Sequence, residues 1–227
     1  GMQASIKGIK TEFESGTPYS REDGDNDLNF YQKPRMLPHL DTQAQSELEG
    51  LYGRLLTKSN RILDLMSSCQ SHLPQNLDPS KVVGLGMNSE ELRLNPRLDQ
   101  SLVHDLNQKP ELPFEDENFD AVICSLSIEY LLQPVKVLQE ARRILVPGGL
   151  LLITFSNRWF PPKVIRIWAE LQEFERTGMV MQWLKEATGF RSLETSSLRE
   201  LPRPWDDRYR KRSPFSDPIY AVWGYKK

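Results

Sequence analysis

The stretch FDAVICSLSIEYLLQPVKVLQEARRILVPGGLLLITF, residues 119–155, has the pattern of a strand, a helix and a second strand. Its two ends, Phe119–Leu126 and Leu150–Phe155, are short apolar runs bounded by polar or glycine residues. Between them, apolar residues recur at helical spacing over Val137–Leu145, and Pro147–Gly149 is expected to end the helix. This order is typical of a βαβ unit, and it predicts a parallel sheet.

Predicted strands and helices alternate on both sides of this unit. Five further runs have the length of strands: Arg61–Met66, Lys81–Gly86, Ser101–Leu106, Phe190–Leu198 and Pro218–Tyr225. Helical spacing recurs from Asp41 to Lys58, in a stripe of Val164, Ile167, Leu171 and Phe174, and over Met179–Ala187, and Asn88–Glu91 has the spacing of a capped helix start. Only a polar loop separates the last two strands, which predicts an antiparallel hairpin at one edge of the sheet.

The composition is that of an ordinary globular chain, and it argues against several classes of function. The chain has 227 residues and a net charge of −2, which argues against a general binder of nucleic acid. It has no apolar run near the ~20 residues that span a bilayer, and residues 1–27 lack the apolar core of a signal peptide. Two separated cysteines, Cys69 and Cys124, and three histidines without ligand spacing predict a reduced, cytoplasmic protein that binds no metal.

We expect a single α/β domain over residues 41–227, preceded by an arm or lid over residues 1–40. The chain is long enough for one substantial core. Its first 27 residues are polar, whereas Asn29–Arg35 is aromatic and basic enough to pack on the domain. Residues 157–187 follow the fifth predicted strand and are rich in aromatic side chains, so we expect a helical segment that caps the substrate pocket.

The motifs of residues 62–149 resemble those of class I S-adenosyl-L-methionine-dependent methyltransferases, in particular the group called type 11. Leu112–Val122, LPFEDENFDAV, is similar to that family's LPF…FD-V motif, and Glu140–Gly149, EARRILVPGG, is similar to its E-R-L-PGG motif. The resemblance implies a Rossmann-like α/β fold with a seven-stranded, mostly parallel sheet of order 3-2-1-4-5-7-6. It also implies that S-adenosyl-L-methionine binds across the carboxyl ends of the first four strands.

The first cofactor motif of that family, an acidic residue followed by GxGxG, is present only in part. Asp64 matches the acidic position, but Met66, Ser67 and Ser68 stand where the resemblance calls for a glycine loop. Glycine permits close backbone approach and positive φ. Serine is also small, and its hydroxyl and N–H groups can hold the cofactor's carboxylate. The alternative is that the two serines only make a turn.

A second departure lies after the second predicted strand, where the family has an acidic residue for the ribose. Here Asn88 can accept one hydrogen bond from a ribose hydroxyl, without the charge-assisted strength of a carboxylate. Asn88 can equally serve as the N-cap of the helix that contains Glu91. Met87 can pack on the adenine or simply fill the core.

The ends of the third and fourth predicted strands agree better with the family. The resemblance implies that Asp105 contacts the adenine amino group and that the backbone of Leu106 contacts the ring. A generic turn aspartate is the alternative for Asp105. By the same analogy, Ser125 and Leu126 line the methyl-transfer channel.

The candidate catalytic residues are His72, Tyr31 and Glu129. Methyl transfer from a sulfonium depends mainly on aligning the acceptor, and a general base is needed only for a hydroxyl or a protonated amine. These three side chains are the available acid/base or acceptor-orienting groups. Each has an alternative: His72 as an ordinary loop residue, Tyr31 as an anchor of the N-terminal segment, and Glu129 as a cap or in a surface ion pair with an arginine.

The sequence therefore predicts a methyltransferase that uses S-adenosyl-L-methionine and acts on a small-molecule acceptor by in-line displacement. The missing glycines and the missing ribose acid support a second hypothesis, a methyltransferase-like binding or scaffold protein without catalysis. A dinucleotide oxidoreductase is a weak third, because Gly84 and Gly86 follow the second strand and lack a third glycine. The acceptor and the oligomeric state stay open.

Overall fold

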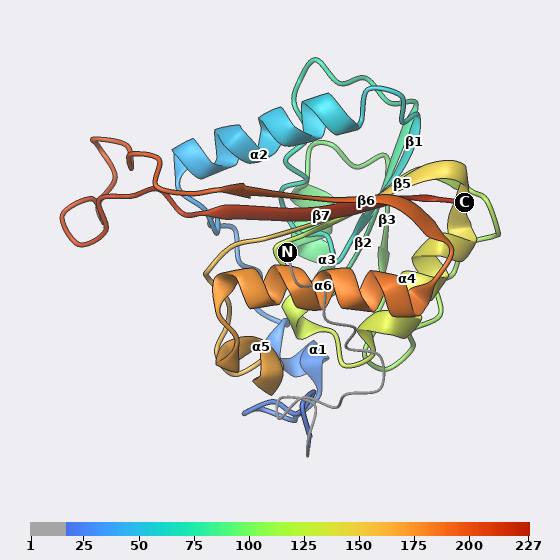
Figure 1. Ribbon diagram of the computed structural model, residues 1–227, viewed down its shortest axis with the longest axis horizontal. Helices are drawn as coiled ribbons and strands as arrows, with labels where there is room; N and C mark the ends of the chain where they lie inside the picture. Colours follow the sequence, from blue (N-terminus) through green and yellow to red (C-terminus); the bar gives the residue numbers. More distant parts are fainter. Residues whose placement is uncertain (1–16) are drawn as a thin grey trace, which may run out of the picture.

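The computed structural model describes residues 17–227, which form a seven-stranded sheet of order β3-β2-β1-β4-β5-β7-β6 (Figure 1). The strands are β1 (Arg61–Leu65), β2 (Lys81–Gly86), β3 (Gln100–Val103), β4 (Phe119–Ser125), β5 (Leu145–Phe155), β6 (Phe190–Leu198) and β7 (Ile219–Lys226). β1 to β5 pair in parallel, and β7 is antiparallel to both β5 and β6. The predicted fold class, strand order and edge hairpin are confirmed.

Helices cover both faces of this sheet. The longer ones are α2 (Thr42–Leu55), α4 (Pro134–Ile144) and α6 (Glu173–Ala187), and the short ones are α1 (Asp27–Phe30), α3 (Ser89–Leu94), η2 (Ile128–Tyr130) and α5 (Arg166–Glu170). α2 lies above β6 and β7 in Figure 1, and α6 lies below them. None of the helices over residues 17–227 is long and apolar enough to cross a membrane.

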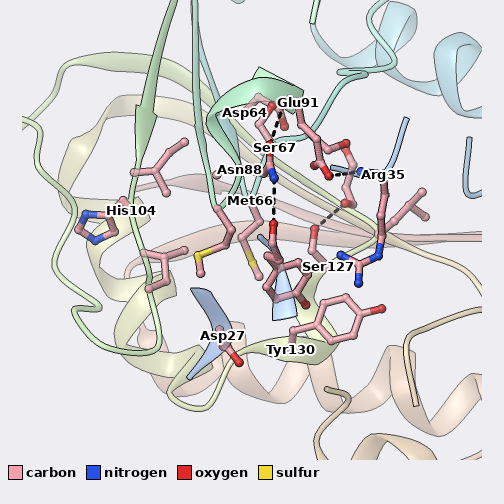
Figure 2. Close-up of a pocket in the computed structure, with 18 of the residues that line it drawn as sticks. Asp27, Arg35, Asp64, Met66, Ser67, Asn88, Glu91, His104, Ser127 and Tyr130 are labelled. Carbon is pink, nitrogen blue, oxygen red and sulfur yellow. Dashed lines mark hydrogen bonds between the residues drawn. The ribbon is translucent and has the colours of Figure 1, made fainter. Parts of the chain in front are cut away.

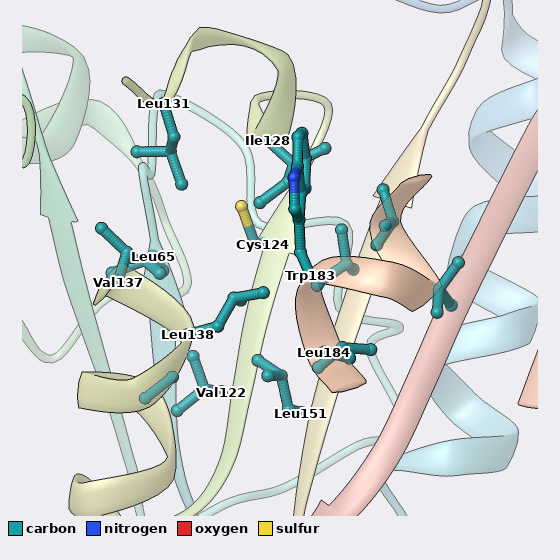
Figure 3. Close-up of a cluster of buried hydrophobic side chains, with 14 of the residues drawn as sticks. Leu65, Val122, Cys124, Ile128, Leu131, Val137, Leu138, Leu151, Trp183 and Leu184 are labelled. Atoms are coloured by element: carbon teal, nitrogen blue, oxygen red, sulfur yellow. The ribbon is translucent and has the colours of Figure 1, made fainter. Parts of the chain in front are cut away.

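Alternate residues of the central strands fill two separate cores. On β4, Val122 and Cys124 point into the core that α4 and α6 cover, and Figure 3 shows them facing Leu138 of α4. Ala121 and Ile123 point the other way, into the core that α2 covers. Because successive side chains alternate between two buried faces, the central strands read as continuous apolar runs in the sequence.

The connection from β1 to β2 contains no helix. Residues 66–80 cross over in turns and irregular backbone, and Leu73 and Leu77 from this loop pack into the core beneath α2. Crossovers between parallel strands usually contain a helix, and the N-terminus of such a helix is a ready anion site. In this protein no helix N-terminus follows β1, and the carboxyl end of β1 is bordered by the side chains and backbone of the loop instead.

The expected helical stripe from Val164 to Phe174 is not one helix. α5 ends at Glu170, and α6 begins three residues later. The N–H of Gln172 donates to Oε2 of Glu175 at 2.7 Å, which is the capping arrangement of a new helix. Phe174 consequently lies on the outer side of α6 and is 63% exposed.

Two further boundaries differ from those predicted. β3 is an exposed strand at the edge of the sheet and ends at Val103, so Asp105 lies in the loop beyond it. α4 ends at Ile144, and Pro147–Gly149 lies inside β5 rather than at the end of the helix. Residues 1–16 of the expected arm lie outside the described part of the chain.

Candidate functional site

A cavity opens at the carboxyl ends of β1, β2 and β4, beside the loop that follows β3 (Figure 2). We call it the inner cavity; its walls come from side chains within residues 27–39, 64–72, 85–91, 104–107 and 125–131, together with Phe160. Its empty volume is about 980 Å³, open solvent included. This edge is where open α/β sheets bind their ligands.

Most of the residues predicted from the sequence meet in the inner cavity. Twelve of the thirteen line it: Tyr31, Asp64, Met66, Ser67, Ser68, His72, Met87, Asn88, Asp105, Leu106, Ser125 and Leu126. The structure thus brings together residues from the N-terminal segment and from the ends of four strands. The exception is Glu129, which is 1% exposed and does not line the cavity.

The carboxylate of Asp64 is held by serines of the loop that follows it. Its Oδ2 accepts hydrogen bonds from the hydroxyls of Ser67 and Ser71, each at 2.6 Å. Burial raises the pKa of Asp64 to about 6, although the two serine hydrogen bonds act in the opposite direction. In the structure described, the hydroxyl of Ser67 therefore binds the strand's own carboxylate.

The backbone of the same loop crosses the end of β2 at close range. The N–H of Ser67 donates to the carbonyl of Leu85 at 2.7 Å. A Cβ atom on Gly86 would overlap the carbonyl oxygen of Ser67. The glycine that permits close backbone approach therefore lies on β2, and not in the loop after β1.

Three residues that line the inner cavity have a left-handed backbone. They are Met66, with φ of 57°, and His72 and Leu126, each with φ of 56°. This conformation is unfavourable for a residue with a Cβ atom, and such strain tends to occur at functional sites. In the family that the sequence resembles, the glycine loop begins at the position of Met66. This residue therefore has a positive φ although it is not a glycine.

One carboxylate oxygen of Asp105 has no partner within the described part of the chain. Its Oδ1 accepts hydrogen bonds from the N–H groups of Asn107 and Gln108, at 2.9 and 3.4 Å. Its Oδ2 is buried and has no hydrogen-bond partner among residues 17–227. A buried acceptor is rarely left unpaired, and this one belongs to a residue that lines the cavity. Asp105 is therefore suited to receive a donor from a ligand.

Asn88 uses both ends of its amide within the protein. Its Oδ1 accepts from the N–H groups of Glu90 and Glu91, each at 3.0 Å, and so caps α3. Its Nδ2 donates to the carbonyls of Tyr31 and Gln32, at 2.9 and 3.1 Å. The structure thus shows the capping role that was the alternative to ribose binding, and it adds a link to the N-terminal segment.

The N-terminal segment closes one side of the inner cavity. Nδ2 of Asn107 donates to Oδ2 of Asp27 and to the carbonyl of Tyr130, each at 2.9 Å. Burial raises the pKa of Tyr31 above its ordinary value, and the nearby carboxylates of Asp27 and Glu129 add to the effect. Sequence reasoning missed Asp27 because it lies in a polar stretch. The only signal nearby was the aromatic and basic run Asn29–Arg35.

The imidazole of His72 is held in its neutral form. Burial, and then the neighbouring His39, lower the pKa of His72 to about 4. The pKa of His39 is lowered as well, by burial and then by Arg158 and Arg35. At neutral pH both rings are therefore uncharged, and each has one ring nitrogen that can accept a hydrogen bond.

Glu129 lies behind the inner cavity and not at the surface. Burial raises the pKa of its carboxyl to about 8, and Oε2 has no hydrogen-bond partner among the described residues. The surface ion pair considered as an alternative is absent from this part of the chain, because the side chain is buried. The proton that Glu129 carries at neutral pH is thus not in contact with the cavity.

A wider cleft adjoins the inner cavity on the side of the N-terminal segment. We call it the outer cleft; its lining residues lie within 34–41, 126–130, 156–160 and 203–209, and its empty volume is about 1680 Å³, open solvent included. The two spaces share these lining residues: Arg35, His39, Leu126, Tyr130 and Phe160. Within residues 17–227, no group of three or more histidine, cysteine or carboxylate side chains is placed to hold a metal ion.

Comparisons with known proteins find similarity to methyltransferases. A family model described as a methyltransferase domain matches residues 68–153. The malonyl-[acyl-carrier protein] O-methyltransferase of Marinomonas sp. is 26% identical over 187 residues, which are 79% of this chain and 67% of that protein. The mitochondrial 2-methoxy-6-polyprenyl-1,4-benzoquinol methylase of Mus musculus is 27% identical over 191 residues, 81% of this chain and 55% of that protein.

The fold has solved counterparts as well. A structure from Thermotoga maritima, described as an S-adenosylmethionine-dependent methyltransferase and possible histamine N-methyltransferase, matches with a TM-score of 0.58. It is 18% identical in sequence, and the match covers 81% of this chain and 89% of that one. At this identity the likeness concerns the fold alone. The chain spans about half to two thirds of the length of the two relatives named above.

Proposed function

We propose that the chain, which matches a methyltransferase domain over residues 68–153 and shares the fold of S-adenosylmethionine-dependent methyltransferases, is such an enzyme and transfers a methyl group to a small-molecule acceptor by in-line displacement. The observation that carries the proposal is the unpaired Oδ2 of Asp105, at the carboxyl edge of the sheet. The names of two relatives denote methylation of malonyl-[acyl-carrier protein] and of 2-methoxy-6-polyprenyl-1,4-benzoquinol. The benzoquinol relative supports a small organic acceptor here.

The residues of the inner cavity fit S-adenosylmethionine. Asp105 would accept a hydrogen bond from the adenine amino group through Oδ2, with Leu106 and Met87 as apolar neighbours of the ring. Asp64 is largely ionised above pH 6 and would attract the ammonium group of the methionine part. Ser67 and Ser68 would offer their backbone at the same end.

This assignment divides the chemistry between the cofactor and the protein. When bound, the cofactor supplies a methyl group made electrophilic by its sulfonium. The chain's own residues position the acceptor: Ser125 and Leu126 lie at the end of β4, and Tyr31 and His72 face the same cavity. The neutral ring of His72 is able to accept a hydrogen bond from an acceptor hydroxyl, and the segment around Tyr31 excludes water.

The proposal also covers the class of partner, the location of the protein and the role of Glu129. A net charge of −2 and a cleft of limited size favour a small molecule over a nucleic acid as partner. The free cysteines are consistent with a cytoplasmic location. Glu129 is not assigned a role at the reacting atoms, because it does not line the cavity.

Calorimetric titration with S-adenosylmethionine tests the proposal directly. We expect saturable binding by the wild type, weakened by about 1–3 kcal/mol in Asp105→Ala because the hydrogen bond to the adenine is lost. Asp78→Ala, a change in the loop after β1 outside the cavity, should bind as the wild type does. Binding that Asp105→Ala leaves unchanged would refute the adenine assignment.

The same titration separates the enzyme from a scaffold. A folded wild type that fails to bind S-adenosylmethionine would favour a methyltransferase-like protein without catalysis. The loop after β1 favours this second candidate, because it lacks a helix N-terminus and its Ser67 hydroxyl is engaged by Asp64. If binding occurs, transfer of a labelled methyl group into a pool of small metabolites shows catalysis and reveals the acceptor.

A further inference from the structure

The outer cleft has a charge opposite to that of the whole protein. Four arginines and two aspartates line it, and Asp217 lies within ion-pair distance of two of these arginines. The cleft with its ion-pair partners therefore keeps one excess positive charge, whereas the chain carries a net charge of −2. His39 adds no charge at neutral pH, because burial lowers its pKa. A positive cleft in an acidic chain attracts anions.

Two of the four arginines are already paired. Nη2 of Arg203 lies 2.9 Å from Oδ1 of Asp217, and its Nη1 lies 3.6 and 3.5 Å from Asp41 and Asp207. Nη1 of Arg158 lies 3.2 Å from Oδ2 of the same Asp217. Arg158 and Arg203 are thus compensated by three carboxylates, whereas Arg35 and Arg208 make no ion pair among residues 17–227.

Arg35 stands where the outer cleft meets the inner cavity. Its Nη1 is buried and has no hydrogen-bond partner in the described part of the chain, and its Nη2 donates to the carbonyl of Phe30 at 3.2 Å. No carboxylate of residues 17–227 lies within ion-pair distance of its guanidinium. The nearby Glu91 accepts the backbone N–H of Arg35 at 2.6 Å instead. The guanidinium thus retains a free donor and an uncompensated charge.

Aromatic rings surround this guanidinium and continue along the cleft. Its Cζ lies 4.5 Å from the ring centroid of Phe30 and 5.0 Å from that of Phe160. Trp159 and Tyr209 line the outer cleft farther out. A cationic fork beside flat apolar walls suits a ligand with an aromatic body and a carboxylate.

We propose that the outer cleft binds the methyl acceptor and that this acceptor is a small aromatic carboxylate, held by Arg35. This inference rests on the proposed function for the identity of the ligand as acceptor. Arg35 gives the carboxylate charge-assisted hydrogen bonds, Phe160 and Trp159 cover the ring, and Arg208 adds long-range attraction from the exposed side.

Ligand-observed NMR titration without any cofactor tests the cleft separately from catalysis. The probes are 3-phenylpropanoate and its neutral amide, 3-phenylpropanamide, which differ in charge but scarcely in shape. We expect the wild type to bind the carboxylate roughly tenfold more tightly than the amide. Arg35→Gln should abolish this preference, and Arg208→Gln should reduce it a few-fold. Arg54→Gln, on the exposed side of α2, should leave it unchanged.

Thermal unfolding of each variant shows whether it is folded. The side chain of Arg208 makes no ion pair among the described residues, so we expect Arg208→Gln to fold. This variant therefore keeps the test valid if Arg35→Gln is unstable. Equal affinity for the two probes, or no binding of either, overturns the proposal. So does a variant Arg35→Gln that keeps the preference but loses affinity for S-adenosylmethionine, since Arg35 would then serve the cofactor. A wild type that prefers the carboxylate but does not bind S-adenosylmethionine supports the anion site and refutes the proposed function.

Discussion

Nζ of Lys163 lies 3.1 Å from Oδ1 of Asp27, and the two side chains are only 1% and 6% exposed. Asp27 also accepts hydrogen bonds from Arg21, at 2.7 Å, and from Asn107, at 2.9 Å. This buried cluster joins three parts of the chain: the N-terminal segment, the segment after β5 and the loop after β3. Because buried charges are stable only while paired, the cluster fixes the segment that covers the inner cavity.

The first prediction concerns this cluster. Lys163→Met should lower the free energy of unfolding by about 2–3 kcal/mol, less than the full cost of an unpaired buried charge because Arg21 remains beside Asp27. Limited proteolysis should also cut the N-terminal segment faster. Lys136→Met, on the exposed side of α4, should change neither quantity. Equal urea denaturation midpoints for the two variants would show that the ion pair does not hold the segment.

The second prediction compares two glycines of β2. At Gly86 an added Cβ meets the carbonyl oxygen of Ser67, whose loop is hydrogen-bonded to the same strand, whereas at Gly84 it meets the flexible side chain of Leu98. Gly86→Ala should therefore destabilise the protein by at least about 1 kcal/mol more than Gly84→Ala, and it should also weaken S-adenosylmethionine binding. Chemical denaturation and calorimetry measure the two effects. The reverse order of stability would mean that the loop after β1 shifts easily.

The third prediction concerns the left-handed backbone of Met66. Met66→Gly loses side-chain contacts but relieves the cost of a positive φ, which is about 1–2 kcal/mol for a residue with a Cβ atom. Met87 lines the same cavity and is also partly buried, but it has no positive φ. The loss of unfolding free energy should thus be about 1 kcal/mol smaller for Met66→Gly than for Met87→Gly. Identical losses would mean that the φ of Met66 is not strained.

The fold could be read from the sequence because its signals are repeated and local. Each central strand is an apolar run buried on both faces, and Asn88 caps α3 where the Asn88–Glu91 spacing predicted. The boundaries of helices were harder to predict where a side-chain hydrogen bond to the backbone interrupts the helical spacing of apolar residues. Glu175 binds the backbone of Gln172 and starts a new helix within an apolar stripe that continues across it.

The site was predictable where it lies at strand ends and not where it depends on distant packing. Asp105 follows β3 and Ser125 is the last residue of β4, so the topology alone brings them to one edge of the sheet. Arg35 and Asp27 reach the cavity only because the N-terminal segment folds back over it, through contacts with Asn107 and Lys163. No periodic pattern in the sequence predicts that the N-terminal segment folds back over the cavity. Likewise, the sequence does not show that Glu129 is buried without lining the cavity.

The last prediction uses the buried carboxyl of Glu129, which carries a proton in the folded protein up to about pH 8. In the unfolded chain the same group loses its proton near pH 4.5. Its contribution to stability is thus fully present below about pH 4.5 and is lost as the pH rises through 8, because the unfolded state then binds fewer protons than the folded state.

Glu129→Gln keeps the shape of the protonated acid and does not titrate. We therefore expect the variant to gain stability relative to the wild type as the pH rises from about 5 to about 8.5, by more than ~1 kcal/mol. Urea denaturation at the two pH values measures the difference, with Glu49→Gln on the exposed side of α2 as the control. If wild type and Glu129→Gln showed the same dependence on pH, Glu129 would ionise freely in the folded protein, and a route for protons from its carboxyl to solvent or to the inner cavity would have to exist.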